Sequence, residues 1–270
     1  MSRPIRTVML LVAACLLAFT VACAEQPPTL PAPSMSTTVT ATVGPTLPPV
    51  GAECRIEATK GRTLRLTNGA GLSVAAVELG KGSSAVVLAH QSDGSLCEWM
   101  PFAEQLAAQG YRVLAFDFVG SGSSSMPKQK TYVEDVRTAV DYVRKQGAMK
   151  VVILGASMGA TMSIVAGAAI APPVDGVIAL SPPLTFDGVN AERAAPSLKS
   201  PVLYIAGDTD GDFATYAKGI YNATPADLRT MLVVTASQHG IRLMDGEVQA
   251  TFQVRTAVLR FLYLHAAPSG

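Results

Sequence analysis

The sequence predicts an α/β protein with a mostly parallel sheet of about eight strands and helices on both faces. From residue 84 onward, short runs rich in Val, Ile and Leu alternate with helical patterns, as they do in βαβ units. Two strands joined by a glycine-containing turn, residues 62–67 and 72–79, come first and predict an antiparallel hairpin. Between residues 150 and 170 a buried strand, a sharp turn and an alanine-rich helix follow one another directly.

The remaining elements are predicted from hydrophobic periodicity. The helix over 132–146 has one apolar stripe, which includes Val136, Val140 and Val143, and a charged opposite face. Further strands are predicted at residues 84–90, 113–118, 151–155, 176–180, 201–206 and 231–235, and further helices at 97–109, 214–222 and 247–265.

The chain divides into three parts. Arg3 and Arg6 precede an apolar run that ends at Cys23, which predicts a signal peptide over residues 1–22. Residues 23–52 are rich in proline and threonine and predict an extended linker. With 49% hydrophobic and 15% charged residues, the chain can bury one large core, so residues 53–270 are predicted to form a single domain.

The end of the signal, Thr20 to Cys23, resembles that of a bacterial lipoprotein, although Thr20 stands where leucine is usual. The resemblance implies that Cys23 carries a lipid that anchors the protein at the outer face of the cell membrane. Simple cleavage and release is the alternative, with Cys15 and Cys23 as small apolar residues of the signal.

Export from the cytoplasm would affect the oxidation state of the other two cysteines, and cleavage of the signal would change the net charge of the mature chain. Cys54 and Cys97 would lie in an oxidising compartment, which predicts a disulfide, with two buried thiols as the alternative. Removing Arg3 and Arg6 leaves 21 − 2 = 19 basic against 20 acidic side chains. This balance gives no support for nucleic acid or an anionic membrane surface as a partner, and we expect a monomer.

Ser157 lies at the apex of the turn after the strand 151–155, in a Gly-x-Ser-x-Gly arrangement. The glycines are expected because a side chain on either side would collide with the neighbouring backbone. The alternative is a tightly packed turn without a chemical role. A serine nucleophile requires a histidine to take its proton and a carboxylate to orient that histidine.

The sequence offers three histidines. His90 ends the third strand, His239 follows the last strand, and His265 ends the last helix, where we expect a surface residue. The functional loops of a parallel sheet lie at the carboxyl ends of its strands, so Ser157, His90 and His239 fall on the same edge. Three aspartates follow the penultimate strand and reach this edge too: Asp208, Asp210 and Asp212.

In these features the sequence resembles the α/β-hydrolase family, over about 210 residues. The matching motifs are strand-His90, Asp117-x-x-Gly120-x-Gly122-x-Ser124, the turn at Ser157, and Gly207-x-x-Asp210 with His239-Gly240 further on. The resemblance implies that Ser157 is the nucleophile, Asp210 the orienting acid and His239 the general base. Asp208 and Asp212 are then fallback acids or loop residues.

The same resemblance implies an oxyanion hole made by the backbone N–H groups of Met158 and Gln91. Many relatives have glycine where this chain has Gln91. His90, directly before it, is expected to position the loop rather than to act as a base. Only residues 181–200 stand where relatives insert a lid, so no large lid domain is expected. The substrate-pocket candidates are His90, Trp99, Leu184 and Phe186, together with Met158. The four apolar residues could equally be core, and the helical stripe favours that position for Trp99.

The predicted function is hydrolysis of a carboxylic ester outside the cytoplasm, with a small-molecule or polymer acyl substrate and no cofactor or metal. A peptidase, a thioesterase or a surface-polymer hydrolase could use the same three residues. A tethered binding protein with an inactive hydrolase fold is a further alternative. Metal binding by His90 and the aspartate cluster is a poor rival, because aspartate is favoured in such turns without any ligand.

Overall fold

The computed structural model describes residues 47–54, 61–246 and 248–268. The predicted signal peptide, the lipidation site Cys23 and the linker up to residue 46 lie outside these residues. Within the described part of the chain, no helix has both the length and the hydropathy that crossing a bilayer requires.

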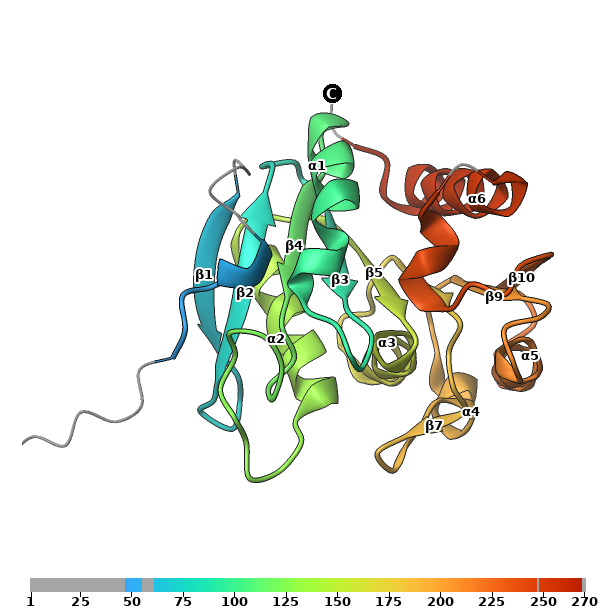
Figure 1. Ribbon diagram of the computed structural model, residues 1–270, viewed down its shortest axis with the longest axis horizontal. Coiled ribbons are helices and arrows are strands. Elements are labelled where there is room, and N and C mark those ends of the chain that lie inside the picture. Colours follow the sequence, from blue (N-terminus) through green and yellow to red (C-terminus); the bar gives the residue numbers. More distant parts are fainter. Residues whose placement is uncertain (1–46, 55–60, 247, 269–270) are drawn as a thin grey trace, which may run out of the picture. The chain divides into compact units, whose positions relative to one another are not determined.

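Eight strands form one sheet, in the order β1-β2-β4-β3-β5-β6-β9-β10. In Figure 1 the sheet runs from β1 (blue) to β10 (orange). The pairs β1–β2 and β2–β4 are antiparallel and the others are parallel, which confirms the predicted hairpin and the mostly parallel sheet. The strands are β1 (Arg62–Thr67), β2 (Ser73–Leu79), β3 (Ser84–Ala89), β4 (Arg112–Phe116), β5 (Lys150–Ala156), β6 (Gly176–Leu180), β9 (Val202–Gly207) and β10 (Arg229–Val234).

Helices cover both faces of the sheet, as predicted. Helices α1 and α6 pack on one face, and α2, α3 and α5 pack on the other (Figure 1). The helices are α1 (Met100–Ala108), α2 (Tyr132–Lys145), α3 (Met158–Ala169), α4 (Ala191–Ala194), α5 (Phe213–Ala223) and α6 (Gln249–Ala266). Short 3-10 helices occur at η1 (Ala52–Cys54), η3 (Leu96–Trp99), η4 (Ala195–Ser197) and η5 (Gly240–Met244).

The side chains of the central strands alternate between two hydrophobic clusters. In β3, Val86 and Leu88 join the cluster under α1 and α6, and Val87 joins the cluster under α2 and α3. Successive side chains of a strand point to opposite faces, so a strand that is covered on both sides must be apolar throughout. Every residue of β3 is buried, which explains why this run shows no polar alternation in the sequence.

The segment between β6 and β9 has more structure than its sequence indicated. It forms a two-stranded hairpin, β7 (Thr185–Phe186) and β8 (Val189–Asn190), followed by α4 and η4. Two-residue strands are too short for a periodic pattern to reveal them. The segment remains a small excursion, in agreement with the absence of a large lid domain.

The predicted disulfide is present between Cys54 and Cys97. It joins the start of the described chain to η3, directly before α1. The residues before Cys54 also contact the domain, since the carbonyl of Pro49 accepts a hydrogen bond from the Ser123 hydroxyl (2.7 Å) and Val50 packs against the core. The predicted linker therefore extends too far, because its last residues belong to the folded unit.

Candidate active site

A tight turn carries the chain from β5 through Ser157 into α3. Ser157 has φ 48° and ψ −115°, a conformation that is unfavourable for a non-glycine residue and persists where the surrounding structure holds it. Its N–H donates to the carbonyl of Leu180 at the end of β6 (2.8 Å). A Cβ on Gly155 would lie 2.3 Å from the carbonyl oxygen of Gly159, and one on Gly159 would lie 2.3 Å from that of Ala89. Close backbone approaches therefore require both glycines, as the motif predicts.

Asp210 and His239 lie in the turns after β9 and β10 and contact each other directly. Nδ1 of His239 is 2.9 Å from Oδ2 and 3.1 Å from Oδ1 of Asp210. A carboxylate can only accept, so Nδ1 carries the proton and Nε2 remains free to act as a base. The side chain of Asp210 is 8% exposed and that of His239 is 30% exposed. The imidazole can therefore meet a substrate while the carboxylate stays behind it.

The other two aspartates of the same turn have different partners. Oδ1 of Asp208 accepts the backbone N–H of Ala236 (3.0 Å). Asp212 is exposed, and its Oδ2 lies 3.4 Å from the hydroxyl of Tyr216. Of the three acids, the structure places only Asp210 against His239.

The turn that carries His239 packs against the serine turn and the loop after β3. A Cβ on Gly240 would lie 3.5 Å from Cβ of Ala156 and 2.4 Å from Oε1 of Gln91. The same oxygen of Gln91 accepts the N–H of Ile241 (3.4 Å). Among the described residues, the Ser157 hydroxyl makes no hydrogen bond with His239. Such bonds are often long before a substrate is bound.

His90 holds the loop after β3 and has no exposed surface. Its Nδ1 donates to the carbonyl of Gln91 (2.7 Å) and its Nε2 accepts the N–H of Phe118 (3.0 Å). Burial lowers the pKa of His90 to about 4, with an opposing effect from the Gln91 carbonyl. Both ring nitrogens are occupied by the backbone, which supports the positioning role and leaves none for a metal. In the described chain, no group of three His, Cys, Asp or Glu side chains could hold a metal ion.

The two predicted oxyanion donors differ in their surroundings. Met158 is the first residue of α3, where amides have no partner within the helix and the helix dipole favours negative charge. The Gln91 backbone, by contrast, lies close to the Glu98 carboxyl and acts to lower its pKa. Burial has the larger effect and raises the pKa of Glu98 to about 7, and its Oε2 is buried without a partner in the described residues. The Gln91 backbone therefore has an acidic side chain nearby, whereas the first turn of α3 contains none.

The four pocket candidates have separate surroundings. Trp99 and His90 have no exposed surface, so neither of these two candidates lines a pocket. Trp99 takes the core alternative that its helical stripe favours. The helical stripe of α1 and η3 turns the Trp99 ring into the core. Leu184 and Phe186 are half-buried and pack against the cluster under α2 and α3, and these two keep exposed surface that a substrate could contact.

Two residues of the site were missed in the sequence. The ring of Phe213, at the start of α5, lies 4.1 Å from that of His239, centroid to centroid. The hydroxyl of Ser181, directly after β6, donates to Oδ2 of Asp210 (2.7 Å). The rule that the strand ends of a parallel sheet share one edge could have found Ser181, whereas the contact of Phe213 depends on how two loops fold.

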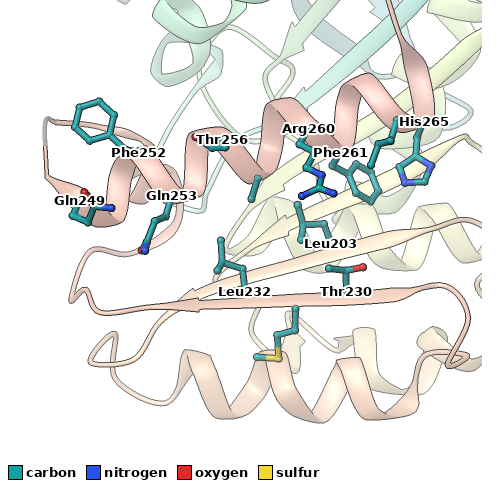
Figure 2. A pocket seen from close by; sticks show the side chains of 13 residues that line it. Leu203, Thr230, Leu232, Gln249, Phe252, Gln253, Thr256, Arg260, Phe261 and His265 are labelled. Atoms are coloured by element: carbon teal, nitrogen blue, oxygen red, sulfur yellow. The ribbon is translucent and has the colours of Figure 1, made fainter.

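A large apolar groove lies away from these residues. It has a volume of about 720 Å³ and lies between α6 and the strands β9 and β10. Figure 2 shows Leu203, Leu232 and Phe261 among the side chains that line it. Neither Ser157, Asp210 nor His239 lines the groove, so its size is no argument for a role in the chemistry.

Together, the eight-stranded sheet, the strained serine turn and the Asp–His pair at its carboxyl edge define an α/β hydrolase. A family model described as "Serine aminopeptidase, S33" matches residues 80–267, well over half of the chain. The chain therefore belongs to this α/β-hydrolase family. No curated protein matches it in sequence.

Solved structures with the same fold include several enzymes. An esterase of Pyrococcus furiosus is 19% identical, with a TM-score of 0.64 over 77% of this chain and 92% of its own. A monoacylglycerol lipase of Paleococcus ferrophilus is 17% identical, with a TM-score of 0.62 over 72% and 99%. An enol-lactonase of Burkholderia xenovorans is 16% identical, with a TM-score of 0.61 over 74% and 99%. At these identities the likeness concerns the fold.

Proposed function

We propose that this hydrolase cleaves carboxylic esters through a covalent acyl-enzyme on Ser157, with His239 as general base and Asp210 as the orienting acid. The observation that carries the proposal is the strained Ser157 turn on the same edge as the direct contact between Asp210 and Nδ1 of His239. That contact leaves Nε2 of His239 to take the serine proton. The esterases and lipases among the structural neighbours are in keeping with this chemistry.

In the proposed mechanism, the Ser157 oxygen attacks the ester carbonyl carbon while its proton passes to Nε2 of His239. The negative charge on the former carbonyl oxygen is stabilised by the Met158 N–H at the start of α3, with the Gln91 N–H as the second donor. His239 returns the proton to the departing alcohol. A water then attacks the acyl carbon by the same route, and Ser157 is released.

The test is turnover of p-nitrophenyl acetate and butyrate by the protein and two serine variants. Ser157→Ala should lower kcat/KM by about a thousandfold or more, because the nucleophile is lost. Ser197→Ala is the matched control, since Ser197 is an exposed serine in η4, and it should keep the activity of the parent. Equal activity in Ser157→Ala and the parent would refute the assignment.

A peptidase is the second candidate, because the matching family model describes serine aminopeptidases. The same three residues would act on an amide. Comparing p-nitrophenyl esters with aminoacyl p-nitroanilides separates the two functions. A binding protein without activity would fail to react with a fluorophosphonate probe, which labels an activated serine.

The proposed location is outside the cytoplasm, with a lipid anchor on Cys23. The N-terminal sequence supports it, and so does the Cys54–Cys97 disulfide, since such bonds persist in oxidising compartments. Metabolic labelling with palmitate should mark the parent and not Cys23→Ser. Labelling of both, or of neither, would contradict the anchor.

A further inference from the structure

Ser181 occupies a strained and completely buried position directly after β6. Its φ is 46° and its side chain has no exposed surface. Among the described residues, only Ser157 and Asp187 share a positive φ without being glycine. A serine is unfavourable in this conformation, and strained residues that persist in a fold often mark functional positions.

The hydroxyl of Ser181 connects the acid turn to the histidine turn. It donates to Oδ2 of Asp210 (2.7 Å) and accepts the N–H of Gly240 (3.1 Å). The same Oδ2 also accepts Nδ1 of His239 (2.9 Å). Two donors on one oxygen fix the rotation of the Asp210 carboxylate, and the bond to Gly240 holds the residue that follows His239.

The backbone at the same place connects to the nucleophile. The carbonyl of Leu180 accepts the N–H of Ser157 (2.8 Å), and the N–H of Ser181 donates to the carbonyl of Ile205 (2.7 Å). The end of β6 thus contacts the serine turn through Leu180 and the acid and histidine turns through Ser181. A displacement of Leu180 and Ser181 would therefore shift the serine turn, the acid turn and the histidine turn.

We propose that Ser181 is a positioning residue that orients Asp210 and, through it, His239. The role rests on the hydrolase function proposed above. Its position needs two properties together, a tolerated positive φ and a hydroxyl. Glycine supplies the first without the second, and alanine supplies neither, so replacement by glycine removes the hydroxyl with the least strain on the backbone.

Ser181→Gly is therefore the informative variant, and Asp187→Gly is its matched control. Asp187 has φ 49° and is exposed in the turn between β7 and β8, so the control relieves the same kind of strain in a turn that carries none of the three proposed catalytic residues. Ser181→Gly should lower kcat by about 10- to 100-fold, as expected for a lost bond to a charged group and a misaligned base. KM should stay within about twofold, and Tm within about 4 °C. Asp187→Gly should keep the parent's kcat.

A double-mutant cycle with Asp210→Asn distinguishes positioning from a general structural role. If Ser181 acts through Asp210, the double variant should be no slower than Asp210→Asn alone, because the orienting carboxylate is already gone. Effects that multiply would overturn the proposal, and so would a Ser181→Gly variant with the parent's kcat. The rate of labelling by a fluorophosphonate probe gives a second readout and should fall in parallel with kcat.

The two proposals fail in different ways. A parent protein that neither turns over esters nor reacts with the probe would refute the hydrolase mechanism and the role of Ser181 with it. A parent that reacts, together with a Ser181→Gly variant that reacts equally fast, would refute only the role of Ser181.

Discussion

Replacing Gly159 by alanine tests whether the serine turn must lie in direct contact with the loop after β3. Its Cβ would lie 2.3 Å from the carbonyl oxygen of Ala89 and 2.6 Å from that of His90. An ordinary carbon–oxygen contact is about 3.3 Å, so Gly159→Ala requires the two backbone segments to separate by about 1 Å. Both oxygens are backbone atoms of buried residues, so the shift cannot be absorbed by rotation of a flexible side chain. Separating Met158 from Gln91 by this amount should lower kcat/KM about 100-fold.

The effect on stability works in two directions. Alanine is favoured over glycine inside a helix by about 1 kcal/mol, whereas overpacking costs about 1 to 3 kcal/mol. Gly159→Ala should therefore have a Tm equal to that of the parent or lower by a few degrees. Gly219→Ala in α5 is the control, because the atoms nearest to its Cβ would belong to the flexible side chains of Glu192 and Leu184, at 3.2 and 3.3 Å. Ester turnover and thermal melts of both variants are the assays. A Gly159→Ala variant with the parent's kcat/KM would refute the reasoning.

Three further predictions concern stability. The Cys54–Cys97 bond spans 43 residues, so the Cys54→Ser, Cys97→Ser double variant should lose about 4 kcal/mol of unfolding free energy in denaturant titrations, with the reduced parent behaving alike. The folded pKa of His90, about 4, lies below its ordinary value of 6.5, so the stabilisation by its neutral ring is complete above pH 6.5 and is lost as the pH falls toward 4. The advantage of the parent over His90→Gln should shrink across that range by up to about 3 kcal/mol. The folded pKa of Glu98, about 7, lies above its ordinary value of 4.5, so the stabilisation is present below pH 4.5 and is lost as the pH rises through 7. Glu98→Gln should therefore melt increasingly above the parent between pH 4 and pH 8, and a constant difference would contradict the burial of this carboxyl.

The sheet could be predicted because its information is local. Buried parallel strands are apolar on both faces, and β3, β5 and β6 have this character after the first residues of β3 and β5, which are Ser84 and the exposed Lys150. The boundaries were less accurate. β4 ends at Phe116 and not at Phe118, because Asp117 turns its carboxylate to the N–H groups of Leu96 and Ser123.

The site could be predicted in part. The glycines around Ser157 indicated a tight turn, and the structure shows the backbone contacts that require them. The choice of Asp210 over Asp208 came from a resemblance, since three aspartates in one turn look alike in the sequence. The contact with His239 distinguishes Asp210. Trp99 is buried in the core, which is the position that its helical stripe favours.

The sequence by itself determined the fold class and the serine turn, because each depends on residue spacing within a strand, a turn or a helix. Only the tertiary structure decided the partners of the buried polar groups. Ser181 lies 29 residues from Asp210 and 59 from Gly240 in sequence. Such contacts depend on how separate loops meet at one edge of the sheet, because a buried hydrogen-bonding group takes whichever partner the packing brings within reach.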